Sequence, residues 1–136
     1  MTKLLLDDDY AALEERSIQY IEDGGQRFLI IADYPLPEGL YVQDKCDVLV
    51  IIPQNYNQGG NDMFWTFPRL VKSDGTPIPQ TQNAGQGDNR TYDGREFCRW
   101  SRHWNKPPSS WRAGKDDVLT ILRRIEWAFR NPDADK

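Results

Sequence analysis

His and Cys, the side chains most often used in metal binding and thiol chemistry, are scarce in this chain. It has one His and two Cys in 136 residues, and these three do not follow any spacing familiar from zinc sites. A phosphate-binding loop is absent too, because no Gly-Lys-Ser or Gly-Lys-Thr occurs and no helix follows the glycine-rich segment. We therefore expect no metal and no other cofactor.

Long hydrophobic runs are absent as well. No stretch approaches the roughly 18 apolar residues that span a membrane, and the short apolar run at residues 4–6 leads straight into three Asp residues. These features predict a cytoplasmic protein that does not interact with a membrane. In that compartment the two Cys are expected to stay reduced, so we predict no disulfide.

The chain is acidic overall, with a net charge of −4, which argues against nucleic acid as a partner. Positive charge is concentrated in residues 90–112, where six Lys or Arg and two acidic residues leave +4. The part of this basic segment that is rich in Arg and Trp also suits stacking on single-stranded bases. A steep salt dependence of binding would reveal that alternative.

The length is that of one domain, residues 1–136, and the hydrophobic pattern predicts an α+β fold. Acidic capping residues followed by Ala and Leu indicate a short helix over residues 7–16. Four segments rich in strand-forming residues follow, and the connections between them are too short for crossover helices, so we expect a four-stranded antiparallel meander. The expected strands are residues 17–22, 27–32, 46–52 and 63–67.

A polar loop and a second helix complete the expected fold. Residues 71–94 have few apolar side chains and many Gly and Pro, so we expect a long loop that is mobile alone and becomes ordered on binding a partner. Beyond it, apolar residues from Val118 to Phe129 recur at helical spacing, with Asp116 or Asp117 as the cap and Asn131-Pro132 as the stop. This amphipathic helix should pack on the meander.

The residues with the most reactive side chains gather in residues 97–104, Phe-Cys-Arg-Trp-Ser-Arg-His-Trp. Cys98 has three Arg residues nearby in the sequence, and positive neighbours stabilise a thiolate. Ser101 stands two residues before His103, so an extended backbone would place both side chains on one face. Thiolate is the stronger nucleophile, whereas Ser101 has a candidate base in His103. The aromatic residues equally suit a buried strand without catalytic function.

With these elements in order, the chain resembles the ubiquitin-conjugating-enzyme fold. It resembles more closely the bacterial conjugating-enzyme-like family found beside ubiquitin-like proteins, activating enzymes and isopeptidase-like genes. The resemblance covers about residues 17–130. The matching marks are residues 34–41 (Tyr-Pro-Leu-Pro-Glu-Gly-Leu-Tyr), 48–53 followed by Tyr56, 62–65 (Asp-Met-Phe-Trp), and 100–104 (Trp-Ser-Arg-His-Trp) before Trp111-Arg112.

The resemblance implies an acyl-transfer site. In eukaryotic relatives the acceptor Cys follows a short glycine-bearing turn, and residues 93–98 (Asp-Gly-Arg-Glu-Phe-Cys) are similar, which makes Cys98 a candidate acceptor. Those relatives carry a His-Pro-Asn triplet whose Asn is linked to the oxyanion, and this chain lacks the triplet. Asn89, nine residues before Cys98, is a candidate substitute, and its alternative role is that of an ordinary turn residue.

In the bacterial group the Ser-Arg-His core is the more characteristic feature, so an oxyester on Ser101 stands beside a thioester on Cys98 as a prediction. His103 would orient or deprotonate the reacting group, and Arg99 or Arg102 would stabilise developing negative charge. The implied partners are a ubiquitin-like protein, whose C-terminal Gly is accepted and passed to an amine, and its activating enzyme. The alternative is a catalytically inactive module that binds one of these partners.

Overall fold

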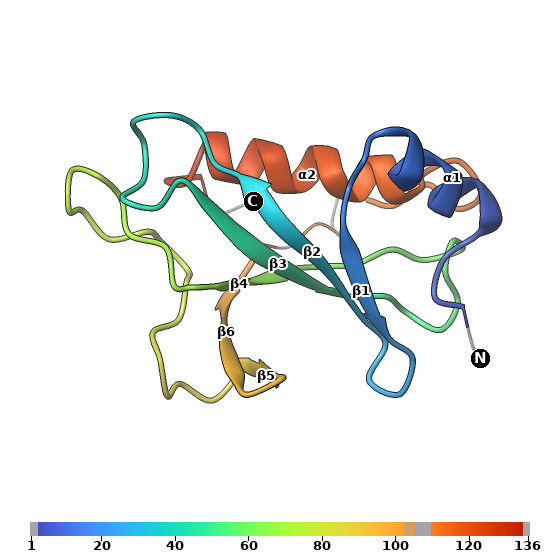
Figure 1. The fold of residues 1–136 in the computed structure, drawn as a ribbon, viewed down its shortest axis with the longest axis horizontal. Coiled ribbons are helices and arrows are strands. Elements are labelled where there is room, and N and C mark those ends of the chain that lie inside the picture. The colour runs from blue at the N-terminus through green and yellow to red at the C-terminus, as the bar shows by residue number, and fades with distance from the viewer. Residues whose placement is uncertain (1–2, 103, 105–109, 135–136) are drawn as a thin grey trace.

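The computed structural model describes residues 3–102, 104 and 110–134, which form an α+β arrangement of helices and one antiparallel sheet (Figure 1). In chain order the elements are α1 (Asp7–Glu15), β1 (Tyr20–Asp23), β2 (Phe28–Pro35), β3 (Lys45–Ile51), β4 (Phe64–Phe67), β5 (Arg90–Tyr92), β6 (Arg95–Trp100) and α2 (Val118–Arg130). Both predicted helices and all four predicted strands are therefore confirmed, with small shifts of their ends.

The sheet is larger than the predicted four-stranded meander. Strands β1 to β4 do form that meander, but β6 pairs with the free edge of β4 and β5 pairs with β6, giving the order β1-β2-β3-β4-β6-β5. The turn between β5 and β6 explains the extra hairpin. Asp93 and Gly94 have positive φ values of 52° and 74°, the conformation of a two-residue turn whose twist matches paired strands. Residues 71–94, predicted to be entirely loop, thus end in a strand.

Helix α2 covers one face of the sheet (Figure 1). Asp117 caps its first turn by accepting hydrogen bonds from the backbone N–H groups of Leu119 and Thr120. Near the other end, the ring of Phe129 meets those of Phe64 and Trp100 edge-on, with centroids 5.4 and 5.3 Å apart. This helix and its contacts confirm the predicted amphipathic helix on the meander.

The opposite face of the sheet carries a second, smaller apolar cluster. Its fully buried members come from β2, β3, β4 and β6: Phe28, Ile30, Leu49, Trp65 and Phe97. Strand β6 therefore contributes Phe97 to this face and Trp100 to the helix side, as the alternation of side chains along a strand requires. By the same alternation, Glu96 and Cys98 lie on the side of Trp100, and Arg95 and Arg99 lie on the side of Phe97.

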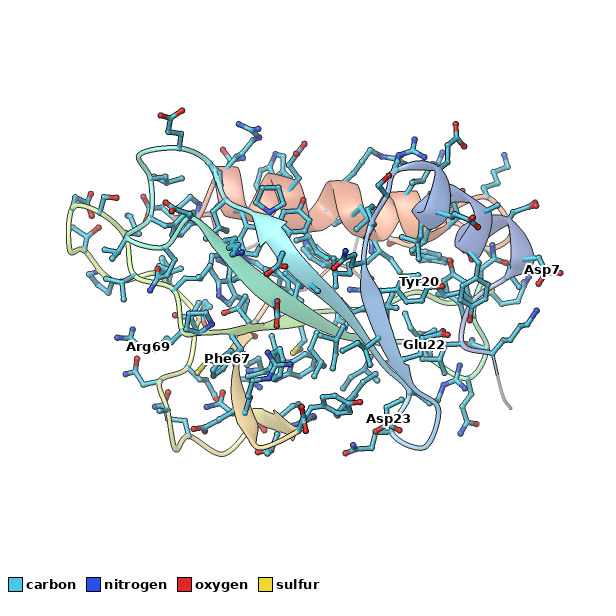
Figure 2. All side chains as sticks on the ribbon, in the orientation of Figure 1. Asp7, Tyr20, Glu22, Asp23, Phe67 and Arg69 are labelled. Carbon is cyan, nitrogen blue, oxygen red and sulfur yellow. The ribbon has the colours of Figure 1, made fainter. Side chains whose placement is uncertain are left out.

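A buried carboxylate ties the two helices together. Asp9 is 3 % exposed and accepts hydrogen bonds from the N–H groups of Leu6, at 3.0 Å, and Val118, at 3.1 Å. Val118 opens α2, where backbone N–H groups have no partner within the helix. Asp9 satisfies one of those donors and so fixes the N-terminus of α2 against α1. From the next position in α1, the hydroxyl of Tyr10 donates to Glu22 of β1 at 2.6 Å, and Figure 2 shows Glu22 on that strand.

The polar segment before β5 is held to the loop between β2 and β3 and to strand β6. Tyr41 and Lys72 form an isolated bridge, and so do Thr81 and Trp100. The backbone N–H of Ser101 donates to the carbonyl of Gln80 at 2.8 Å. Residues 80–82 therefore run along the edge of β6 next to β5. The mobility of this segment and its ordering by a partner stay predictions.

Candidate functional site

Cys98 lies in β6 opposite Thr66 of β4 and is 4 % exposed. Burial raises the pKa of its thiol above the usual range, and the negative charge of Glu96 raises this pKa further. The positive charge of Arg69 lowers the pKa of the Cys98 thiol. Figure 2 shows Arg69 just beyond the end of β4, toward the edge of β4 with which β6 pairs. The thiol is therefore protonated at neutral pH in this arrangement.

The prediction that the flanking Arg residues stabilise a Cys98 thiolate is wrong for Arg95 and Arg99. The guanidinium of Arg95 pairs with Asp47 at 2.6 Å, and that of Arg99 pairs with Asp88 at 2.7 Å. Both lie on the opposite face of β6, because residues an odd number of positions apart in a strand point to opposite sides. Arg95 and Arg99 are thus close to Cys98 in the sequence, but their side chains do not lie near its thiol.

Asn89 is the predicted residue that the structure does bring to Cys98. Its side-chain nitrogen Nδ2 is 3.9 Å from the Cys98 sulfur, which is within hydrogen-bonding reach of sulfur. The hairpin explains this placement: Arg90 pairs with Phe97, so the residue before Arg90 comes opposite the residue after Phe97. A spacing of nine residues across a two-residue turn therefore places the amide beside the thiol.

Glu96 is a neighbour of the site that the sequence reasoning missed. Its carboxylate accepts hydrogen bonds from Asn89 Nδ2 at 2.9 Å and from the N–H of Gly85 at 2.7 Å. These two bonds, that of the Asn89 amide first, lower the pKa of Glu96 below its usual range. The available signal was its position two residues before Cys98, which puts both side chains on one side of a strand.

Ser101 directly follows β6, and its residue is 8 % exposed. Ser101 stands three positions after Cys98, which in extended chain is a distance of about 10 Å between their Cα atoms. The two candidate acceptors, Cys98 and Ser101, therefore lie at two separate places in the structure. His103 lies outside the described residues, so its pairing with Ser101 stays a prediction.

Arg102 is fully buried and holds three chain segments together. Its guanidinium donates to the carbonyls of Pro79 at 3.3 Å and Pro132 at 3.2 Å, and it stacks 4.9 Å from the ring centroid of Trp100. These contacts join the polar segment before β5 to the residues after α2 and give Arg102 a structural role. Its predicted role in stabilising negative charge during catalysis stays a prediction.

Two concave regions lie near these elements. A cavity of about 380 Å³ is bordered by Asp88, Arg90 and Arg99, which flank Asn89 and Cys98 in the sequence. An open groove of about 700 Å³ lies between α2, strand β2 and residues 16–19, which join α1 to β1. Of the described candidate residues, Arg99 lines the smaller region, whereas Asn89, Cys98, Ser101 and Arg102 line neither. The thiol of Cys98 thus lies beside, and not inside, the smaller cavity.

Three further properties concern the described part of the chain. There, no three His, Cys, Asp or Glu side chains gather in a way that could hold a metal ion. No helix within the same residues is long and apolar enough to cross a membrane. Cys46 and Cys98 are both free thiols.

Comparisons with known proteins give one match. A search of curated proteins and a search of solved structures each found no match. A scan against protein-family models matches residues 5–131 to the model described as "Prokaryotic E2 family E". This match spans nearly the whole chain and confirms the resemblance to bacterial ubiquitin-conjugating-enzyme-like proteins. The chain therefore belongs to prokaryotic E2 family E, a membership that suggests a role in ubiquitin-like conjugation.

Proposed function

We propose that this protein accepts the C-terminal Gly of a ubiquitin-like protein as a thioester on Cys98 and passes it to an amine. The observation that carries the proposal is the Asn89 amide nitrogen 3.9 Å from the Cys98 sulfur, because an N–H donor beside the acceptor is what an acyl-transfer site needs. Membership of an E2 family supports the conjugation role and its two partners, the ubiquitin-like protein and its activating enzyme.

The chemistry consists of two acyl transfers. In the first, the Cys98 thiol loses its proton to water, the resulting thiolate attacks the thioester that the ubiquitin-like protein forms with its activating enzyme, and the thiolate of that enzyme leaves. In the second, an amine attacks the same carbonyl carbon, the bond to Cys98 sulfur breaks, and the proton lost by the amine passes to water. Each step puts negative charge on the carbonyl oxygen, where an N–H group of Asn89 would stabilise it.

The acceptor can be tested with the activating enzyme, ATP and the ubiquitin-like protein. We expect a covalent adduct in the intact mass of the wild-type protein. Cys98→Ala should abolish the adduct, because no other thiol lies beside Asn89, and Ser101→Ala should retain it. Treatment with a thiol reductant should release the adduct, because thiols exchange with thioesters.

Ser101 serves as the matched alternative in this experiment. An adduct that survives in Cys98→Ala, disappears in Ser101→Ala and resists thiols while yielding to hydroxylamine would make Ser101 the acceptor through an oxyester. No adduct with a competent activating enzyme would contradict acyl transfer altogether.

A second candidate function is binding of the same partners without turnover. The observation that favours it is the burial of Cys98 together with the raised pKa of its thiol, both of which oppose nucleophilic attack. This function predicts that Cys98→Ala and Ser101→Ala bind the ubiquitin-like protein or the activating enzyme with unchanged Kd in calorimetry, and that no adduct forms.

A further inference from the structure

We propose that Glu96 is a positioning residue that holds the Asn89 amide toward the acyl group on Cys98. This inference rests on the proposed function, since it assigns a role in the reaction at that thiol. It is carried by a chain of short contacts in which Glu96 binds Asn89 Nδ2 at 2.9 Å and the same nitrogen lies 3.9 Å from the Cys98 sulfur.

The hydrogen bonds of Asn89 fix which end of its amide faces Cys98. The oxygen Oδ1 accepts from the backbone N–H of Arg99 at 3.0 Å, so the nitrogen must occupy the other end. That nitrogen has only two hydrogens, and it has shorter contacts to the carbonyl of Asn83, at 2.8 Å, and to Glu96 than to the sulfur. The carboxylate is thus one of the three groups that set the direction of the amide.

Glu96 also fixes the segment from which Asn89 emerges. Its carboxylate oxygen Oε2 accepts from the backbone N–H of Gly85 at 2.7 Å as well as from Asn89. The Gly85 side of this bridge is exposed loop, whereas Glu96 belongs to β6, which is paired to β4 and β5. A single charged side chain on the sheet therefore holds both the loop and the amide in place.

In the reaction, this arrangement keeps a donor next to the position where charge develops. When an amine attacks the acyl group on Cys98, the carbonyl oxygen becomes negative and one Asn89 N–H turns from its present acceptor to that oxygen. The C–N bond forms, the C–S bond breaks, and the amine loses its proton to water. Glu96 stays ionised and touches no reacting atom, so it acts through Asn89 and is not itself a catalytic residue.

The carboxylate has a second effect of opposite sign. Its charge raises the pKa of the Cys98 thiol, so removing it should make the free thiol more reactive while the transfer step becomes slower. A role limited to general stability predicts no such division between the two steps. The opposite signs therefore separate positioning from simple structural support.

The test uses a small acyl donor, so it does not depend on the partner proteins. The 2-mercaptoethanesulfonate thioester of N-acetyl-Gly-Gly transfers its acyl group to Cys98 with release of the mercaptan, and intact mass measures the load. Free lysine then discharges the acyl-protein, and the discharge rate is compared among Asn89→Ala, Glu96→Ala, Glu96→Gln and the double alanine variant. Glu38→Ala, at an exposed position in the turn after β2, is the control.

We expect Asn89→Ala to slow discharge by about 100-fold, the usual effect of losing an oxyanion donor. Glu96→Ala should slow it at least about 10-fold, and the double variant should be no slower than Asn89→Ala, because Glu96 acts through that amide. Glu96→Gln, which keeps an acceptor oxygen, should stay within about 3-fold of the wild type. Glu38→Ala should match the wild type.

Alkylation by iodoacetamide provides the second readout. Glu96→Ala should shift the alkylation of Cys98 to lower pH, while Cys46, buried at 3 % exposure, stays unreacted and shows that the core remains closed. Discharge rates that multiply in the double variant, or a Glu96→Gln as slow as Glu96→Ala, would overturn the positioning role. If the wild-type protein loads and discharges and Glu96→Ala does so at the same rates, this inference alone is overturned. If the wild-type protein takes no acyl group, the proposed function is overturned and this inference with it.

Discussion

The two Cys residues show how neighbours decide the chemistry of a side chain. Both thiols are buried, at 3 % exposure for Cys46 and 4 % for Cys98, and burial raises both pKa values. A carboxylate raises each pKa further, but only Cys98 also has an amide in contact with its sulfur and a guanidinium that lowers its pKa. A thiol whose pKa is set by several charges can be tuned by substituting each of them.

The charge of Arg69 gives a prediction for the reactivity of Cys98. Arg69 lowers the thiol pKa, so Arg69→Ala should raise that pKa and slow alkylation by iodoacetamide near pH 8 by a few-fold. The sign is opposite to that expected for removing Glu96. Alkylation rates of Cys98 measured against pH by mass spectrometry check this prediction, and Arg16→Ala, at an exposed position that ends α1, is the control. Faster alkylation of Arg69→Ala would contradict the assignment of these charges.

Among the elements, the hairpin of β5 and β6 is what assembles the candidate site. Its two-residue turn pairs Arg90 with Phe97 and so brings Asn89 to Cys98. The turn depends on positive φ at both central residues, a conformation that Gly adopts without strain and that residues with a Cβ adopt at a cost. Gly94 is therefore required by backbone geometry and not by crowding, since an added Cβ would meet no atom within 4 Å.

Gly94→Ala tests the importance of this turn. We expect a loss of about 1 kcal/mol in unfolding free energy, because φ is 74° at this position and Ala disfavours the left-handed region. Urea denaturation measures the change. Gly87→Ala is the matched control, because Gly87 also has no atom within 4 Å of an added Cβ and its φ lies outside the positive range. Equal losses for both variants would show that the turn conformation is not what stabilises the hairpin.

The whole molecule is a sheet with helix α2 on one face and a polar segment attached along its edge (Figure 1). That segment is anchored at two points, Lys72 and Pro79. Lys72, whose side chain is 6 % exposed, pairs with Asp133 at 2.8 Å, and Arg102 joins Pro79 to Pro132. Beyond these two anchors, residues 83–88 are exposed. Glu96 and Asn89 bond to this stretch near its start, and Arg99 and Trp65 bond to Asp88 at its end. The part nearest to the candidate site is thus also the part with the least burial.

Amide hydrogen exchange can test whether this segment is ordered by a partner. Without the ubiquitin-like protein or its activating enzyme, we expect amides 83–87 to exchange fastest, because their residues are exposed and make few backbone hydrogen bonds. Binding should protect them. The N–H of Gln82, bonded to Arg99 at 3.0 Å, should be protected in both states and serves as the internal control. Equal exchange of amides 83–87 in both states would refute ordering on binding.

The helices, the first four strands and the family resemblance could all be predicted from the chain because each depends on nearby residues. The spacing of Val118, Ile121, Ile125 and Phe129 indicates α2 before any contact is known. The runs of β-branched residues in β2 and β3 indicate strands in the same way. The polar composition of residues 71–94, in contrast, concealed β5, since a three-residue strand has too few apolar side chains to be recognised.

The site depended on contacts between residues whose partners the chain order does not reveal. Pairing of β6 with β4 buries Cys98 and turns Arg95 and Arg99 away from it. The thiol of Cys98 is therefore protonated, where the sequence had predicted a thiolate. The hairpin of β5 and β6 makes Asn89 a neighbour of Cys98 and Glu96 a hydrogen-bond partner of Asn89. Local propensity and periodicity act between residues a few positions apart, whereas desolvation and strand pairing act through space. The identities of the candidate site residues were therefore present in the sequence, whereas the direction of their pKa shifts and their hydrogen-bond partners came from the fold.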